Sequence, residues 1–356
     1  MARTPDISLG NGGAGASREV GAAAAVVGAA AIAGKLVWDR RADAEREAEQ
    51  AFRLYRDETI PDGIRRVARG QLDQAHAELA EAPKRKLAAA VHDTRKSLKR
   101  LRTTVRLARG AIGDEIYRRE NAAFRDSGRR LSGVRDASVL METLDELETV
   151  SGDDLPWGAT AKLHERLEDE RKQALESLSA DDAVVTAVVA DIEEARTRTA
   201  AWTFETQGFE ALEPGLRRIY RRGRKAMRCA QADATNENLH EWRKRVKDLW
   251  HAEQILRPAA PKKLKKLAKR THALSDLLGD DHDLAELRLS VGRHPDSFDD
   301  RVAQVAQMAV IDRRRNELQR QAFALGPKLY RRSPKRFVEA MERRWRNHVQ
   351  PPAAAA

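Results

Sequence analysis

The sequence predicts an all-α protein, and three observations support this fold class. Apolar side chains recur every three or four residues from about Trp38 onward, which is the period of an amphipathic helix. No stretch shows the strict alternation of apolar and polar residues that is typical of a half-buried strand. Proline and glycine divide the chain into pieces of helical length, which predicts about a dozen helices. The dividing residues are Pro61, Pro83, Gly113, Pro156, Gly208, Pro214, Pro258, Pro261, Gly279, Pro295, Gly326 and Pro334.

The two ends of the chain are expected to lie outside the helical domain. Residues 1–37 are predicted to form a flexible arm rich in Gly and Ala. Its apolar run over residues 20–34 is interrupted by Lys35 and is shorter than the ~20 residues of a bilayer span. Contact of the arm with a membrane or a granule surface remains an alternative. Residues 349–356 are predicted to be a disordered tail.

Composition narrows the classes of partner. Charged residues make up 34% of the chain and the net charge is +11, so any affinity for anions depends on where the cations are placed. Aromatic residues make up 5%, which disfavours a stacking platform for single-stranded nucleic acid. The single cysteine, Cys229, excludes an internal disulfide and a cysteine-based zinc site, and it fits a reducing cytoplasm.

An internal repeat organises the rest of the chain. Residues 91–109 align with residues 239–257 at an offset of 148, and shorter matches precede and follow in the same order. The sequence therefore predicts a duplicated helical unit, with halves at about residues 45–203 and 208–348. The matched pairs are His92 and His240, Arg95 and Arg243, Lys96 and Lys244, Lys99 and Lys247, Arg65 and Arg217, Arg66 and Arg218, Arg69 and Arg221, and Asp136 and Asp283.

Each copy of the repeat is predicted to place cations and apolar residues on two neighbouring stripes of one helix. The basic stripes are His92, Arg95, Lys96, Lys99, Thr103 and Arg106 in the first copy, and His240, Arg243, Lys244, Lys247 and His251 in the second. The apolar stripes are Val91, Thr94, Leu98, Leu101, Val105 and Ala108, and Leu239, Trp242, Val246, Leu249 and Leu256. Like charges at this spacing repel by a few tenths of a kcal/mol per pair, and a bound polyanion relieves that repulsion. A solvated surface is the alternative, which the duplication disfavours.

The two repeated histidines are expected to respond to a bound anion. Neighbouring cations disfavour the protonated ring, so His92 and His240 are predicted to titrate below the usual value of about 6.5. A polyanion reverses that field, which predicts the highest affinity at acidic pH. A hydrogen-bonded interior role for either histidine alone remains the alternative.

An acidic run over residues 280–283 suggests a different class of function. His282 and Asp283 together are compatible with a metal-dependent phosphohydrolase. In the first copy Arg135 stands at the position of His282, and Asp136 alone is shared. This difference favours Asp136 and Asp283 as helix N-caps or as groups that orient cations. No catalytic triad, Gly-rich phosphate loop or zinc-ligand spacing is visible in the sequence.

Two His-led basic helices, each followed some forty residues later by LSGVRD or LGDDHD, resemble the CHAD family, the conserved histidine α-helical domain. The resemblance covers about residues 45–348 and predicts a domain over residues 38–348. It implies two pseudo-symmetric helical bundles facing a central basic channel, and a non-enzymatic protein that binds inorganic polyphosphate, associates with polyphosphate granules and needs no cofactor. Nucleic acid is a less favoured partner. The expected polyphosphate-binding residues are His92, Arg95, Lys96, Lys99, Arg106, Arg65, Arg66 and Arg69 in the first half, and His240, Arg243, Lys244, Lys247, Arg217, Arg218 and Arg221 in the second half.

Overall fold

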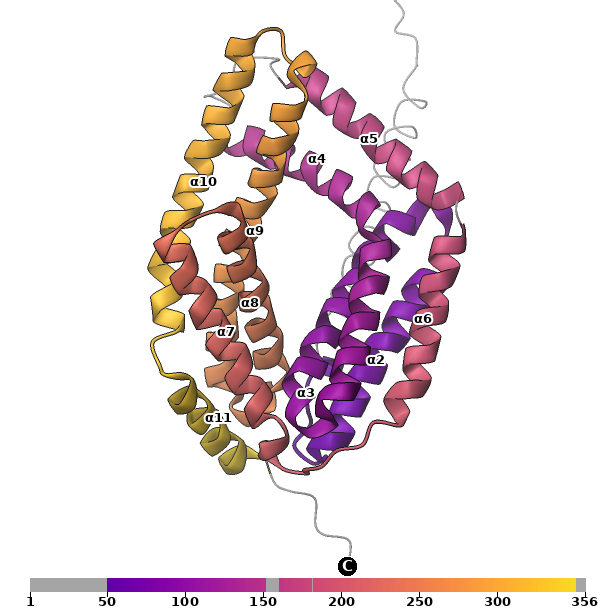
Figure 1. Ribbon diagram of the computed structural model, residues 1–356, viewed down its shortest axis with the longest axis vertical. Coiled ribbons are helices and arrows are strands. Elements are labelled where there is room, and N and C mark those ends of the chain that lie inside the picture. Colours follow the sequence, from indigo (N-terminus) through magenta and orange to yellow (C-terminus); the bar gives the residue numbers. More distant parts are fainter. Residues whose placement is uncertain (1–49, 152–159, 181, 350–356) are drawn as a thin grey trace, which may run out of the picture. The chain divides into compact units, whose positions relative to one another are not determined.

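Every regular element in the part of the chain that the computed structural model describes, residues 50–151, 160–180 and 182–349, is helical (Figure 1). The prediction of an all-α protein is confirmed. Phe52 begins a unit of the fold that continues to the end of the chain. The α-helices of this unit are α2 (Ile60–Ala80), α3 (Leu87–Arg130), α4 (Ser132–Ser151), α5 (Ala161–Ala180), α6 (Asp182–Ala200), α7 (Glu213–Ala232), α8 (Asn236–Ile255), α9 (Pro261–Arg293), α10 (Arg301–Leu329) and α11 (Pro334–His348).

The predicted arm, residues 1–37, and the tail after Val349 lie outside the described residues. Val349 itself is buried, with 8% of its surface exposed. Among the described helices, none combines the length and the apolar character that a membrane span requires.

Polar caps and proline mark the helix starts. The side chains of Thr59 and Thr235 accept hydrogen bonds from backbone N–H groups in the first turns of α2 and α8. Asp300 and Ser333 cap α10 and α11 in the same way. Each cap satisfies a backbone donor that has no partner within the helix. Proline occupies the first turn of four helices, where its missing N–H costs nothing, at Pro61, Pro214, Pro261 and Pro334.

Two glycines that were expected to end helices lie inside them. Gly279 is within α9 and Gly326 is within α10, so both predicted boundaries are wrong. An isolated glycine costs a helix only about 1 kcal/mol, which tertiary packing offsets. At Gly326 the reason is close packing, because a Cβ atom there would lie 2.7 Å from the indole of Trp242.

Gly113 reverses the direction of α3. Its φ of 80° lies in the left-handed region that glycine adopts without strain. Arg106 donates to the side chain of Asn121 over 3.1 Å, although 15 residues of straight helix would separate them by roughly 22 Å. Arg95 likewise donates to the carbonyl oxygen of Gly128, 33 residues further along, over 3.1 Å. The helix is therefore two arms that lie against each other.

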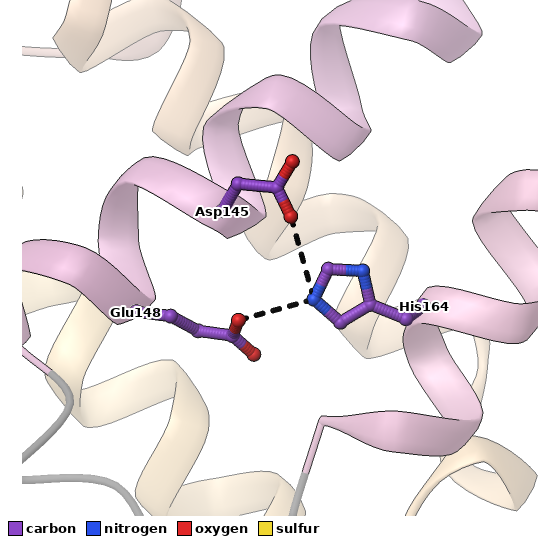
Figure 2. A group of neighbouring side chains, drawn as sticks. All are labelled: Asp145, Glu148 and His164. Carbon is purple, nitrogen blue, oxygen red and sulfur yellow. Dashed lines mark hydrogen bonds and ion pairs between the residues drawn. The ribbon is translucent and has the colours of Figure 1, made fainter. Parts of the chain in front are cut away.

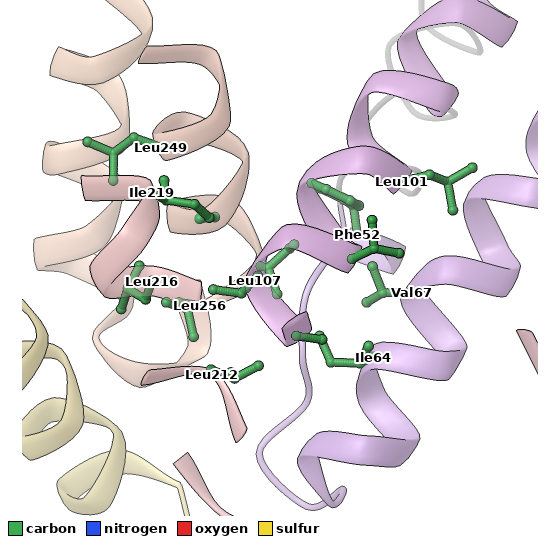
Figure 3. Packing of buried hydrophobic residues seen from close by; sticks show 14 of the residues in the cluster. Phe52, Ile64, Val67, Leu101, Leu107, Leu212, Leu216, Ile219, Leu249 and Leu256 are labelled. Atoms are coloured by element: carbon green, nitrogen blue, oxygen red, sulfur yellow. The ribbon is translucent and has the colours of Figure 1, made fainter. Parts of the chain in front are cut away.

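The main hydrophobic core joins the two halves of the domain (Figure 3). Every residue of the predicted apolar stripes on α3 and α8 is buried, which confirms those predictions. Leu107 of α3 lies beside Leu212 and Leu216 at the start of α7. The backbones approach closely, since a Cβ atom on Gly215 would lie 2.0 Å from the carbonyl oxygen of Leu107. Glycine at position 215 is therefore what allows α7 to pack on α3.

A second hydrophobic cluster joins the halves at another place. Leucines on α4 and α5 pack there with apolar side chains of α9 and α10. The buried members are Leu144, Leu147, Leu163, Leu167, Leu284, Leu287, Val291, Phe298, Val310, Ile311 and Leu318. Elements of the first predicted half thus contact elements of the second predicted half in two apolar clusters.

Candidate anion-binding site

The two predicted basic stripes lie on helices that contact each other, α3 and α8. The charge of Lys99 on α3 is among the influences that lower the pKa of His240 on α8. Lys99 and Lys247 both contribute to lowering the pKa of the buried His251, for which burial is the main cause. The structure therefore brings cations of both stripes into one electrostatic environment.

Asp248 is the centre of this environment. One carboxylate oxygen accepts a hydrogen bond of 2.8 Å from Arg106 of α3, and the other lies 2.9 Å from Nη1 of Arg245 on α8. Only 10% of the Asp248 side chain is exposed. Burial, with Arg106 as a further cause, lowers the pKa of the neighbouring Arg102 to about 10. Two guanidinium groups thus pair with one carboxylate where α3 meets α8, and Arg102 lies near enough to feel its charge.

A second carboxylate, Glu241, neutralises part of the adjoining charge. Its carboxylate oxygens lie 2.8 Å from Lys244, 3.1 Å from Arg245 and 3.5 Å from Arg222. Counting both carboxylates, four cations pair with two anions: Arg106, Arg222, Lys244 and Arg245 with Glu241 and Asp248, and Arg102 lies near them.

A pocket opens beside this group, between α3, α7 and α8. It has an empty volume of about 270 Å³, open solvent included. Five arginines and one carboxylate line it, which makes it strongly basic. The lining residues are Arg106, Arg109, Tyr117, Arg218, Ile219, Arg222, Arg245 and Asp248.

His240 lies next to the acidic run of α9. Its ring centroid is 4.2 Å from that of His282. Burial, with nearby cations as further causes, lowers the pKa of His240 to about 4 and that of His282 to about 3. The predicted direction is thus confirmed for His240, although burial outweighs the neighbouring cations. For His92 the expectation stays a prediction.

The prediction that Asp136 and Asp283 are helix N-caps is wrong. Asp136 lies within α4 and Asp283 within α9, because α9 continues through Gly279. Asp283 instead lies 4.0 Å from Arg243, which agrees with the alternative that it orients a cation. His282 and Asp283 are not part of any group of three potential metal ligands found among the described residues.

Two members of the basic stripes are buried rather than available to a ligand. Thr103 is 1% exposed and donates to Asp248, and His251 is 6% exposed and packs edge-on against Phe52. Stripe membership was wrong for them because Thr103 faces Asp248 of the contacting helix α8 and His251 packs against Phe52. His92, Lys96, Lys99 and Lys244 are exposed, as a binding stripe requires.

The predicted arginines of α2 make contacts within the fold. Arg65 donates to the carbonyl oxygen of Trp202, and Arg66 donates to Glu58 and packs on the ring of Tyr55. Arg69 is exposed, and its guanidinium lies 3.9 Å from the carboxylate of Asp73. These contacts hold the connecting segments at the start of α2. A role of these arginines in binding an anion stays a prediction.

The corresponding arginines of α7 are more exposed. Arg217 pairs with Glu213 on the same helix, Arg218 lines the basic pocket, and Arg221 is exposed. Of the predicted residues outside the stripes, Arg218 is therefore the one that the structure brings to the pocket.

Several residues of the site were not predicted. Arg102, Arg222, Arg245 and Asp248 escaped notice because the repeat does not match them to like residues in the other copy, and Arg109 was missed although the repeat aligns it with Arg257. The spacing of Arg245 and Asp248, three residues apart on one helix, is a signal that could have identified the pair.

Comparison with known families gives one result. The family model of the CHAD domain matches residues 66–291, more than half of the chain, and this range runs from α2 to α9. No curated protein matches the chain.

Proposed function

Because this chain belongs to the CHAD-domain family, we propose that it binds inorganic polyphosphate where α3 and α8 meet. The observation that carries the proposal is the pair of guanidinium groups on Asp248, with Arg102 nearby, next to a pocket lined by five arginines. The family makes the ligand class plausible, and the charge arrangement supports the location.

The chemistry of the side chains fits a chain of phosphates. Each guanidinium presents a planar fork of donors that matches two phosphate oxygens, and each lysine supplies a point charge. Arg102, Arg106 and Arg245 are largely buried, and burial of a cation costs free energy that an anion recovers. The exposed Lys96 and Lys244 extend the basic surface along both helices. A flexible polyanion would follow these stripes with the pocket as its most basic point.

The order of helices supports the proposed duplication. Adding the offset of 148 to the bounds of α5 and α6 gives residues 309–328 and 330–348. The first range lies within α10, and the second ends at the last residue of α11. We infer two related bundles whose basic helices, α3 and α8, face the same ligand.

The proposed role is binding and not catalysis, with polyphosphate granules as the place where it acts. A binding titration with long-chain polyphosphate tests the proposal, and duplex DNA at equal total charge serves as competitor. Polyphosphate should displace labelled polyphosphate more effectively than DNA does. Equal displacement by DNA would identify a general polyanion-binding surface instead.

The enzymatic alternative is tested in the same samples. Incubation with polyphosphate and Mg²⁺ should release no orthophosphate. Release that disappears in Asp283→Asn would establish the phosphohydrolase that His282 and Asp283 suggested.

A further inference from the structure

Three side chains of types that bind metals converge between α4 and α5, away from the basic site (Figure 2). The Nε2 atom of His164 is 3.2 Å from a carboxylate oxygen of Glu148 and 3.6 Å from one of Asp145. One potential ligand atom from each residue lies within 4.8 Å of the other two. It is the single such group of three within the described ranges.

The positions on the helices explain the convergence. Asp145 and Glu148 are three residues apart on α4, so their side chains lie on the same face. His164 is in the first turn of α5, which packs against α4. Figure 2 shows the imidazole directed from α5 toward both carboxylates.

The separations suit a metal centre. Ligands at about 2.0–2.2 Å from an ion in tetrahedral or octahedral geometry lie about 3.0–3.5 Å from one another. The two separations from His164, 3.2 and 3.6 Å, are close to this range, and the ligand atoms of the two carboxylates lie within 4.8 Å of each other.

We propose that Asp145, Glu148 and His164 bind a divalent first-row transition-metal ion. A neutral imidazole and two carboxylates carry a charge of about −2, which balances the dication. Imidazole suits zinc, copper, iron and nickel, and carboxylate suits manganese, so this mixed set favours a transition metal over calcium or magnesium. Three protein ligands leave the remaining positions to water.

A hydrogen bond and the nearby packing hold the ligands in place. Thr160 donates its hydroxyl hydrogen to Oε1 of Glu148, which leaves Oε2 directed at His164. Such contacts orient metal ligands in characterised centres. Leu144, Leu147 and Leu163, which adjoin the ligands in sequence, are buried in the second hydrophobic cluster. The helices that supply the ligands are thus fixed by packing before an ion binds.

A bound ion would link α4 to α5 at the place where these helices contact α9 and α10. The competing explanation is a protonated His164 that forms ion pairs with both carboxylates. Metal titration separates the two explanations, because an ion pair binds no metal.

The test uses the full chain without a histidine tag, treated with a chelator and transferred to phosphate-free buffer. Calorimetric titration with ZnCl₂, and separately with MnCl₂, should reveal one site per chain. His164→Gln should weaken binding by about 100-fold or more, since loss of an outer-shell partner alone costs 10–100-fold. His272→Gln is the matched control, because His272 pairs with one carboxylate, Asp276, and should leave binding unchanged.

Absence of stoichiometric binding of either ion by the unaltered chain would overturn the proposal. Equal affinity of His164→Gln and the unaltered chain would also overturn it. Circular dichroism of the metal-free variants establishes that they are folded. Asp145→Asn replaces His164→Gln if that variant is unfolded, and it should weaken binding in the same direction.

Discussion

Asp248 on α8 accepts a 2.8 Å hydrogen bond from Arg106 on α3, although 142 residues separate them in the sequence. The same carboxylate pairs with Arg245 on its own helix. One acidic side chain therefore both joins the halves of the domain and neutralises part of the proposed anion site. Asp248 therefore contributes both to the folding stability of the protein and to the charge of the proposed anion site.

Asp248→Asn should destabilise the protein and increase its response to polyphosphate. Removing one partner of a buried ion pair costs about 3 kcal/mol, because the remaining cations are left unpaired. Polyphosphate should recover part of that loss, so its stabilising effect should be larger in the variant. Urea unfolding at pH 7, with and without polyphosphate, measures both quantities.

Asp312→Asn is the control for this variant. Asp312 pairs with Arg288 over 2.7 Å, but 43% of its side chain is exposed, so the change should cost less than about 1 kcal/mol. If Asp248→Asn is no less stable than Asp312→Asn, the role of Asp248 as a shared counterion is refuted.

Polyphosphate affinity should fall steeply with salt. Each contact with a flexible polyanion contributes a log-log slope of about 0.7, taking single-stranded nucleic acid as a guide. Replacement of Lys96, Lys99 and Lys244 with Ala should therefore reduce the slope by about 2. The control replaces three exposed cations of α10 and α11, Arg320, Lys328 and Lys335, and should leave the slope nearly unchanged. Equal slopes in the two triple variants would place the binding site elsewhere.

Binding should take up protons through His240. In the free protein its pKa is about 4 against an ordinary value of 6.5, so the ring is neutral near pH 6. A bound polyanion favours the charged ring and raises that pKa, so affinity should increase as pH falls through the bound-state value toward about 4. Calorimetry near pH 5.5 in buffers of different ionisation enthalpy measures the uptake. His240→Gln should take up fewer protons, and an unchanged uptake would assign the protons to other groups.

The same low pKa affects the free protein. Below pH 6.5 the unfolded chain binds protons at His240 that the folded chain does not, so folding stability falls as pH decreases toward about 4. His240→Gln should reduce this acid sensitivity. Thermal unfolding at pH 7 and pH 5 compares the two proteins.

Glu253 should make the protein less stable at alkaline pH. It is fully buried on α8, and burial raises its pKa from 4.5 to about 8. The folded state holds this proton between those values, so the stabilisation is present below pH 4.5 and is lost as pH rises to about 8. Glu253→Gln preserves a neutral side chain of similar shape, and its stability relative to the unaltered chain should increase between pH 5 and pH 9. Exposed Glu237→Gln on the same helix should show a small, constant difference in thermal melting.

Gly215→Ala should disrupt the contact between the halves. A methyl group would lie 2.0 Å from the carbonyl oxygen of Leu107, and this backbone contact has no flexible side chain that moves away. We expect a loss of at least about 3 kcal/mol, at the upper end of overpacking costs. Gly70→Ala is the matched control in α2, where nothing lies within 4 Å of the added methyl group. That change should be neutral or stabilise by up to about 1 kcal/mol. Similar melting temperatures for the two variants would contradict the close packing.

The buried faces of α3 and α8 could be predicted because helical periodicity depends on sequence neighbours alone. Val91, Leu98, Leu239 and Val246 all follow the three- and four-residue spacing and are buried. The burial of Arg245 could not be predicted this way, since its charge assigns it to the solvated face of the helix. It is buried because α7 packs beside α8 and brings Arg222 against the same carboxylate, Glu241.

The group at His164 lacked a sequence signal for a different reason. Its ligands come from two helices, and 16 residues separate His164 from Glu148. No short motif encodes that spacing, because it depends on how α4 and α5 pack against each other. Similarly, the sequence predicted a helix boundary at Gly113 but not the reversal there. The left-handed backbone angle of Gly113 produces that reversal, which brings Arg106 to Asn121.

The reversal at Gly113 also determines the order in which parts of the protein can assemble during synthesis. The contacts between the two arms of α3 join residues that are 15 and 33 positions apart in the sequence. This hairpin can therefore close soon after it leaves the ribosome. The pair of Arg106 and Asp248 spans 142 residues and must wait until α8 has been made. A nascent chain that stops before α8 therefore has the first basic helix but not the shared counterion, and it gains all residues of the proposed anion site only when α8 is translated.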